Sequence, residues 1–424
     1  MKSFTGIAAA MLLAALPLCG FAAAQDTFKA GAAFRVITPD PLLPVSGGVG
    51  KPNPATVKKG ELTTRALVFE KGGTRVAIVS VDNLGWPAVL GDKTRAKVKG
   101  IPPENILIGA THTHSAPDAY GFPDMNGQHG ADLNYLNRVC DLMAEAINEA
   151  VDTLRPATLK IAVDRAKGKI AYNYYAPELY DPRCGVIQAV AADGDDKGKT
   201  IATLVNYATH PEVIGNDQGI LSPDLCGPLY DRIAEKTGGM GIFMNGAQGG
   251  MVTADCRDDN GGKDIQTWEE CIRIGNLMAD EALRIVAEAP VQENPNLYCA
   301  ARPVSFPMDS PLLKAVISMS PLGYNLPGDD FTTRVNLVNI GTAQVLTIPG
   351  EALPNIGYHV KRHMPARNAF LFGLTNDAIG YMLTSVDWMS FDRYEYISET
   401  SLGEKTGDLY IEAALKFIEE SPKP

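Results

Sequence analysis

The chain of 424 residues lacks several features that would place it in familiar classes of protein. It has no excess of basic residues, because 38 lysines and arginines are outweighed by 49 aspartates and glutamates, giving a formal net charge of −11. Such a chain offers no basic surface to neutralise phosphates, which argues against nucleic acid as a partner. None of its seven cysteines belongs to a Cys-x-x-Cys pair, so a cysteine-based zinc site is not expected. We also find no internal repeat and no low-complexity linker.

Apolar runs long enough to cross a membrane are absent beyond the N-terminal segment, so no transmembrane segment is expected. The N-terminus combines Lys2, an apolar run at 7–18 and small residues at 22–24, which are the three parts of a secretory signal peptide. We therefore expect residues 1–24 to be a cleaved signal peptide. The mature chain, 25–424, is then predicted to be periplasmic or secreted.

Six cysteines remain in the mature chain, and an oxidising compartment permits disulfides between them. Cys256 and Cys271 flank a loop rich in Asp and Gly, which makes them the favoured pair for a bridge. The alternative is that several cysteines are simply buried apolar residues.

The order of apolar and polar residues predicts a single α/β domain over 25–424, with mixed β-sheets flanked by helices. Short β-branched runs alternate with longer amphipathic ones, as in such domains. The expected strands are 64–69, 75–81, 106–111, 159–163, 185–191, 201–207, 241–244, 334–340, 344–348 and 370–374. The expected helices are 133–154, 224–236, 267–288 and 408–419.

Four of these strands run directly into polar residues whose side chains could take part in catalysis or metal binding. They lead into the segments 111–115 (THTHS), 206–212 (NYATHPE), 245–250 (NGAQGG) and 349–351 (PGE). Ligands of open α/β sheets bind at the carboxyl ends of the strands, so four such ends can converge on one pocket.

Three of the six histidines close apolar strands. His112 and His114 are two residues apart in an extended run, so their side chains leave the same face, and His210 ends another strand. Neutral imidazole is the commonest metal ligand, and three nitrogen or oxygen ligands with an open position are typical of catalytic zinc. One such histidine alone is more often structural, but the three together favour a metal site.

Other residues carry weaker signals. Glu351 could complete a metal shell or act as a general base, although a solvated glutamate is the commoner case in such a segment. The glycine-rich segment 245–250 could bring backbone N–H groups close to an anion, but it lacks the Gly-Lys-Ser/Thr ending of a phosphate-binding loop. Tyr381 has no intrinsic signal of function and on its own reads as a half-buried core residue.

Together these segments resemble the catalytic domain of the neutral/alkaline, non-lysosomal ceramidase family. The first histidine motif and the Pro-Gly-Glu segment are its most specific parts, and the resemblance spans nearly all of the mature chain. It runs in order through 36–39 (VITP), 111–117 (THTHSAP), 209–211 (THP), 221–224 (LSPD), 245–247 (NGA), 349–351 (PGE) and 381–395.

By position, the resemblance implies a zinc ion bound by His112, His210, Glu351 and Tyr381, with His114 close to the metal in the active site. It also implies hydrolysis of an amide, in which zinc lowers the pKa of a bound water toward ~7 and polarises the carbonyl.

Two departures from the family bear on the substrate. The family's catalytically important serine lies in a Gly-Asp-Val-Ser-Pro-Asn-like stretch, where this chain has Gly250 for the aspartate and Val252 for the serine. Valine can neither attack nor donate a hydrogen bond, and Thr253 could replace the serine only if the loop shifts by one residue. The chain also has no counterpart of the family's C-terminal β-sandwich domain. We expect Gly249 and Gly250 to line the pocket and metal-activated water to be the nucleophile.

The sequence thus predicts an exported zinc hydrolase that acts on a small-molecule or lipid-like substrate. The bond that it cleaves is either an amide, as in an N-acyl or sphingolipid-like compound, or an ester. The alternative, motivated by Val252, is a degenerate family member that binds metal or ligand without catalysis. Phosphoester or glycoside cleavage on the same scaffold is a minor option, because the sequence offers no second carboxylate pair or phosphate clamp.

Overall fold

The structure is a computed structural model that describes residues 1, 26–47, 51–124, 126–258, 260, 262–324, 326, 328 and 330–424. Apart from Met1, the predicted signal peptide lies outside the described residues. Within them, no helix is both long enough and apolar enough to cross a membrane.

A nine-stranded mixed sheet forms the centre of the molecule. Its order is β13-β11-β10-β8-β1-β4-β5-β6, with β15 also paired to β8. The pairs at both ends of this order, β5 with β6 and β11 with β13, are parallel, whereas the pairs between them are antiparallel. The strands are β1 Lys29–Val36, β4 Thr63–Lys71, β5 Thr74–Val81, β6 Ile106–Ala110, β8 Arg155–Arg165, β10 Arg183–Ala191, β11 Thr200–Tyr207, β13 Met240–Asn245 and β15 Val291–Gln292.

A second sheet of four strands packs against the first. It consists of β16 Leu297–Pro307, β17 Asp330–Ile340, β18 Ala343–Thr347 and β20 Asn368–Phe372, and β18 and β20 are parallel. Buried side chains of both sheets form one shared core, including Leu67, Ile78, Val345 and Phe370. Strands buried on both faces read as continuous apolar runs, which is why β6 (ILIGA) and β18 (AQVLT) contain no charged residue.

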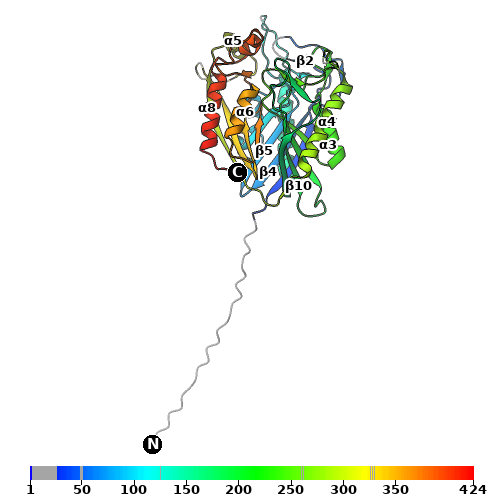
Figure 1. The fold of residues 1–424 in the computed structure, drawn as a ribbon, viewed down its shortest axis with the longest axis vertical. Helices are drawn as coiled ribbons and strands as arrows, with labels where there is room; N and C mark the ends of the chain where they lie inside the picture. Colours follow the sequence, from blue (N-terminus) through cyan, green and yellow to red (C-terminus); the bar gives the residue numbers. More distant parts are fainter. Residues whose placement is uncertain are drawn as a thin grey trace.

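Helices cover the outer faces of both sheets, so the fold has four layers (Figure 1). Amphipathic helices bury one stripe each, and α4 is capped at its N-terminus by Thr267, whose side chain accepts the Glu270 N–H. The helices on the large sheet are α1 Ala88–Arg95, α2 Leu133–Asp152, α3 Cys226–Thr237 and α4 Trp268–Ala287. Those on the side of the small sheet are α5 Pro311–Met319, α6 Pro354–His363 and α8 Thr406–Glu419.

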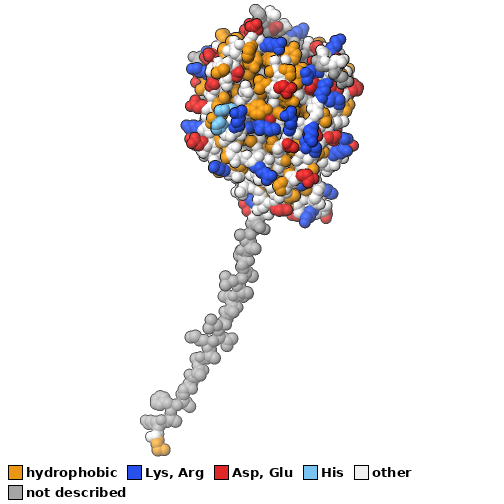
Figure 2. Space-filling model, viewed as in Figure 1, with side chains coloured by type: hydrophobic (Ala, Val, Ile, Leu, Met, Phe, Trp, Pro, Cys, Tyr) orange, Lys and Arg blue, Asp and Glu red, His pale blue; other side chains and the backbone are white. Residues whose placement is uncertain are grey.

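Short elements complete the described chain and carry several site residues. They are β2 Val45–Ser46, β3 Val57–Lys58, β7 Ala116–Pro117, β9 Ala171–Asn173, β12 Ile220–Leu221, β14 Val252–Ala254, β19 Glu351–Ala352, β21 Tyr381–Met382, η1 Pro103–Asn105, η2 Asp392–Tyr394 and α7 Glu395–Glu399. On the face shown in Figure 2, acidic and basic side chains are interspersed with exposed hydrophobic ones.

The predicted α/β class with mixed sheets flanked by helices is confirmed, and every expected strand and helix is present within a few residues. The expectation of a Cys256–Cys271 bridge is wrong. All six cysteines of the described chain are free thiols, five of them buried, so they serve as small apolar core residues.

Candidate metal and active site

Three strand ends meet where the two sheets adjoin. His112 follows β6, His210 follows β11, and Glu351 begins β19 just after β18. The Oε2 atom of Glu351 lies 3.4 Å from Nε2 of His112 and 3.2 Å from Nε2 of His210. The predicted convergence of strand ends is therefore confirmed for the two histidine motifs and the Pro-Gly-Glu segment.

Both imidazole rings are fixed through their second nitrogen. Nδ1 of His112 lies 2.5 Å from the carbonyl oxygen of Leu84, and Nδ1 of His210 lies 2.7 Å from that of Val252. A carbonyl can only accept, so each Nδ1 carries a proton, and each Nε2 is turned toward Glu351. His112 also adopts a left-handed backbone with φ of 74°, a strain that is typical of functional positions.

Asn245, the last residue of β13, ties the two histidine segments together. Its side-chain amide donates to the carbonyl oxygens of Thr111 at 3.0 Å and Thr209 at 2.8 Å. These carbonyls belong to the residues just before His112 and His210. The Asn-Gly-Ala segment thus acts on the site by holding its backbone.

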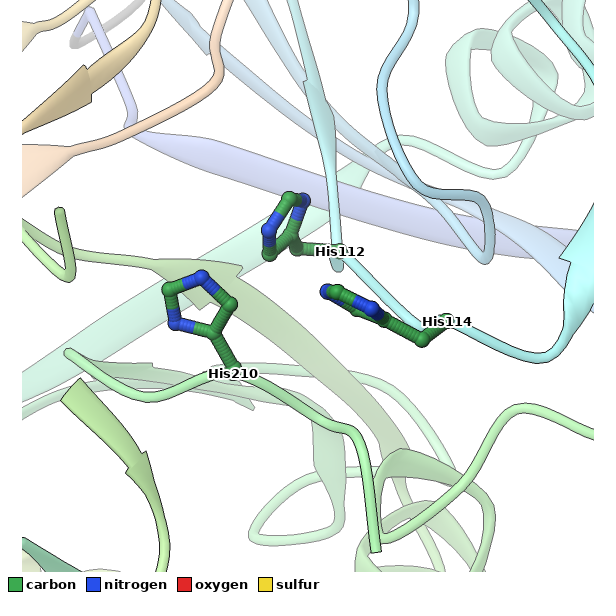
Figure 3. A group of neighbouring side chains, drawn as sticks. All are labelled: His112, His114 and His210. Carbon is green, nitrogen blue, oxygen red and sulfur yellow. The ribbon is translucent and has the colours of Figure 1, made fainter. Parts of the chain in front are cut away.

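His114 completes a group of three imidazoles that face one another (Figure 3). One ligand atom from each of His112, His114 and His210 lies within 4.8 Å of the other two. Burial lowers the pKa of His114 to about 4, so its ring is neutral near pH 7. Its Nε2 is buried without a hydrogen-bond partner among the described residues, and its Nδ1 lies 3.7 Å from Oε2 of Glu212.

Glu212 is a site neighbour that the sequence did not single out. Burial alone would raise the pKa of its carboxyl, but the three nearby histidines and Thr253 hold it below its usual value. Its position two residues after His210 was the only available signal.

The donor set fits a divalent metal such as zinc. Nε2 of His210 and Oε2 of Glu351 are buried and make no hydrogen bond within the described chain, which is costly unless another group pairs with them. Two ligand atoms about 2.0–2.1 Å from a tetrahedral zinc are ~3.3 Å apart, close to the separations of the histidine nitrogens from Glu351.

The pKa shifts of Glu351 and His210 also fit a metal site. Burial would raise the pKa of Glu351, but the positive charge that His112 and His210 can carry beside it holds it well below its usual range. Burial would lower the pKa of His210, whereas Glu351 raises it to about 9. The site therefore stabilises positive charge beside Glu351, which either a proton or a metal cation can supply.

Tyr381 lies next to this cluster. Its strand, β21, pairs in parallel with β19 and sets Tyr381 directly opposite Glu351. Burial raises the pKa of the Tyr381 phenol well above its usual value, and the hydroxyl lies 3.5 Å from Sδ of Met251.

Gly249 and Gly250 lie behind Glu351 and are not among the described residues that line the site cavity. The N–H of Gly249 donates to the carbonyl of Ala352 at 3.0 Å, and a Cβ at Gly249 would lie 2.1 Å from the carbonyl oxygen of Glu351. Gly250 has φ of 67°, which glycine adopts without strain. Gly249 thus permits the close approach of the strand that carries Glu351, and a role of either glycine in the pocket stays a prediction.

A cavity of about 110 Å³ opens beside the cluster. His112, His114, Glu351 and Tyr381 line one part of it, and the rest is mainly aromatic and aliphatic. The other described lining residues are Gly47, Leu84, Tyr120, Phe122, Leu313, Ile317, Tyr324, Phe331, Ala378, Ile379, Gly380, Tyr396 and Thr400.

Comparison with known proteins finds similarity in structure only. No protein-family model matches the chain, and no curated protein matches it in sequence. The crystal structure of neutral ceramidase from Pseudomonas aeruginosa superposes with a TM-score of 0.73 at 17% identity, covering 94% of this chain and 76% of that one. The structure of a ceramidase complexed with C2 gives the same values.

The fold is therefore ceramidase-like, which confirms the resemblance at the level of architecture. At this identity the likeness carries the fold alone, and the chemistry has to be argued from the residues of this chain.

Proposed function

We propose that this protein is an exported, metal-dependent hydrolase that cleaves an amide or ester bond. The observation that carries the proposal is the pair of separations of 3.2 and 3.4 Å from one Glu351 oxygen to the Nε2 atoms of His210 and His112. Both rings already donate through Nδ1 to backbone carbonyls, so their free nitrogens suit a metal and not a further acceptor.

In this proposal His112, His210 and Glu351 hold zinc, with Tyr381 as the fourth ligand. When bound, zinc lowers the pKa of a water molecule and polarises a carbonyl. His114 has a buried, unpartnered Nε2 beside this cluster and positions the substrate by a hydrogen bond. The aromatic and aliphatic wall of the cavity excludes bulk water and holds the apolar part of the substrate.

Water is the proposed nucleophile, because Val252 stands at the position of the family's serine. The Val252 side chain is fully buried in the core beneath α3 and α4. Its contribution to the site is its carbonyl oxygen, which accepts from Nδ1 of His210.

The first test is metal analysis of the purified mature protein. Wild type, loaded with zinc and dialysed, should retain close to one zinc per chain, and His210→Ala should retain none. His363→Ala is the matched control, because His363 is exposed on α6, and it should bind zinc as wild type does. Zinc retained in full by His210→Ala would refute the assignment.

The second test separates a hydrolase from a non-catalytic binding protein. A panel of chromogenic N-acyl amides and esters is assayed with and without a chelator. Turnover that the chelator abolishes and zinc restores supports the hydrolase. Activity in a metal-free His210→Ala protein would contradict the mechanism, and metal binding without any turnover would favour the non-catalytic alternative.

Export and a single domain over 25–424 are part of the proposal. The support is the order of Lys2, the apolar run at 7–18 and the small residues at 22–24. Sequencing the N-terminus of protein expressed in a bacterial host tests it, because cleavage after Ala24 leaves Gln25 as the first residue. An uncleaved chain recovered from the cytoplasm would count against export.

A further inference from the structure

The cavity beside the metal cluster has a polar end and an apolar end. The polar end is formed by His112, His114, Glu351 and Tyr381. The apolar part is contributed chiefly by aromatic rings and by two side chains of α5, as follows: Tyr120, Phe122, Leu313, Ile317, Tyr324 and Phe331. A carbonyl at the polar end would therefore have its attached group surrounded by rings and aliphatic side chains.

The cavity is small. Its volume of about 110 Å³ falls below the roughly 300–1,000 Å³ of pockets that hold drug-sized ligands. An apolar cavity of ~150 Å³ in an unrelated protein accommodates one benzene molecule. The space here thus encloses about six carbon atoms, in a ring or a short chain, and cannot enclose a long acyl chain.

The aromatic wall is held in place by hydrogen bonds. Ser320 Oγ donates to the carbonyl oxygen of Tyr120 at 2.9 Å, and the Tyr324 hydroxyl lies 3.5 Å from the same oxygen. The buried carboxylate of Asp118 accepts the backbone N–H groups of Tyr120 at 2.8 Å and Gly121 at 3.0 Å. Two segments far apart in the sequence are thereby locked together, so the wall does not retreat freely to admit a larger group.

A second hollow of about 330 Å³ lies on the other side of this wall. Tyr324 and Phe331 line both spaces, so they form the partition between them. Removing the Tyr324 ring would connect the small cavity to a space about three times larger.

The acyl part of the substrate is the better match for this cavity than the amine part. An amine released by hydrolysis becomes an ammonium ion near pH 7, and burying an unpaired cation in an apolar space is costly. Among the described lining residues the only carboxylate is Glu351, which already faces two histidines. The leaving amine therefore departs toward solvent, and the acyl group stays between the rings.

We infer that the site, acting as the hydrolase proposed above, is specific for compact acyl groups of about six carbons, short aliphatic or aromatic, and that Tyr324 sets this limit. The inference rests on the proposed function for the identity of the substrate, and on the cavity and its partition for the size limit.

The test is a chain-length series measured by binding as well as by turnover. Straight-chain carboxylates from acetate to palmitate are titrated calorimetrically into zinc-loaded protein, and the matching p-nitrophenyl esters are assayed for kcat and KM. Affinity should rise about fourfold for each methylene buried, up to about hexanoate, and then stop rising or fall. Benzoate should bind about as well as hexanoate.

Three variants locate the limit. Tyr324→Ala should let affinity continue to rise to dodecanoate and lower the KM for the long ester, with hexanoate little changed. Tyr324→Phe keeps the ring and should behave as wild type. Phe122→Ala, which shortens another part of the wall, should relax the limit if Tyr324→Ala fails to fold.

The outcomes separate this inference from the proposed function. A length limit in binding without turnover of any ester in the series or of any N-acyl amide in the chromogenic panel supports the cavity and refutes the hydrolase. Turnover and affinity that rise without interruption to palmitate in wild type refute the size limit and leave the hydrolase standing. A limit that persists unchanged in both Tyr324→Ala and Phe122→Ala overturns the role of the aromatic wall.

Discussion

Gly249→Ala should uncouple Glu351 from the histidines without replacing any proposed metal ligand. The new Cβ would lie 2.1 Å from the carbonyl oxygen of Glu351, 2.7 Å from its carbonyl carbon and 2.8 Å from that of Ala352. All three are backbone atoms, so no side chain can rotate out of the way. Because real Cβ contacts do not fall below about 3.0 Å, the strand carrying Glu351 has to move by about 1 Å.

That displacement is large for a metal site. Ligand distances are expected to hold within about 0.2 Å, so a shift of ~1 Å in Glu351 misplaces one of the proposed ligands. We expect zinc affinity to fall by at least the 10–100-fold that follows loss of a supporting contact. Overpacking of this kind also costs about 1–3 kcal/mol of folding stability.

The assay is zinc affinity by competition with a chromophoric chelator, together with urea unfolding of the metal-free protein. Gly262→Ala is the matched control, because a Cβ there meets nothing within 4 Å, and it should leave both quantities unchanged. Wild-type zinc affinity in a folded Gly249→Ala protein would show that Glu351 is not held as the structure places it.

Three further substitutions test a buried ion pair, a proposed metal ligand and a helix cap. Asp181→Asn should destabilise the protein by about 3–5 kcal/mol in urea at pH 7, because it leaves Lys361, 2.9 Å away and largely buried, without its partner. Burial would raise the pKa of Asp181, but Lys361 and a second cationic side chain hold this pKa at about 2. The folded protein should therefore lose about 2 kcal/mol of stability, present above pH ~4, as the pH falls to about 2. Over this window the difference in unfolding free energy between wild type and variant should narrow. Tyr381→Phe should weaken zinc binding about 10–100-fold in the chelator competition while leaving metal-free stability unchanged, and equal affinity would remove Tyr381 from the ligand set. Thr267→Ala should cost about 1 kcal/mol in urea through loss of the cap on the Glu270 N–H, with zinc content unaltered.

The sequence predicted the parts of the site that follow from strand ends. His112, His210 and Glu351 each come just after a short apolar run, and the length and β-branched content of such runs identify them as buried strands. Ligands of α/β folds bind at the carboxyl ends of strands, so a common pocket could be expected without knowing the strand order. The contact itself depends on packing, because β6 and β11 lie near opposite ends of the large sheet and β18 belongs to the second sheet.

Other parts depend on packing between distant segments and left no local signal. β16 contains two prolines and reads poorly as a strand, yet it pairs along its whole length with β17. Helices α5 and α6 are short, and each starts at a proline. Since α5 and the loop after it supply Leu313, Ile317 and Tyr324, the size of the cavity could not be predicted.

The role of Gly249 likewise depends on packing against a distant segment. A Gly-Gly pair after a strand suggests an anion-binding turn. The contact that requires glycine is with the backbone of Glu351, about one hundred residues later in the chain, and only the folded structure reveals it.

The backbone of Val252, and not its side chain, supports the histidine cluster. The backbone of Val252 accepts both the N–H of His210 at 2.8 Å and its Nδ1 at 2.7 Å, and any side chain leaves that carbonyl in place. Its own side chain is fully buried in the core, away from the described cavity lining. Val252→Ser should therefore bind zinc as wild type does and gain no activity, while losing about 2–4 kcal/mol from the vacated volume and the buried hydroxyl. Increased turnover in Val252→Ser would show that this position reaches the substrate, and the case for water as the nucleophile would then fail.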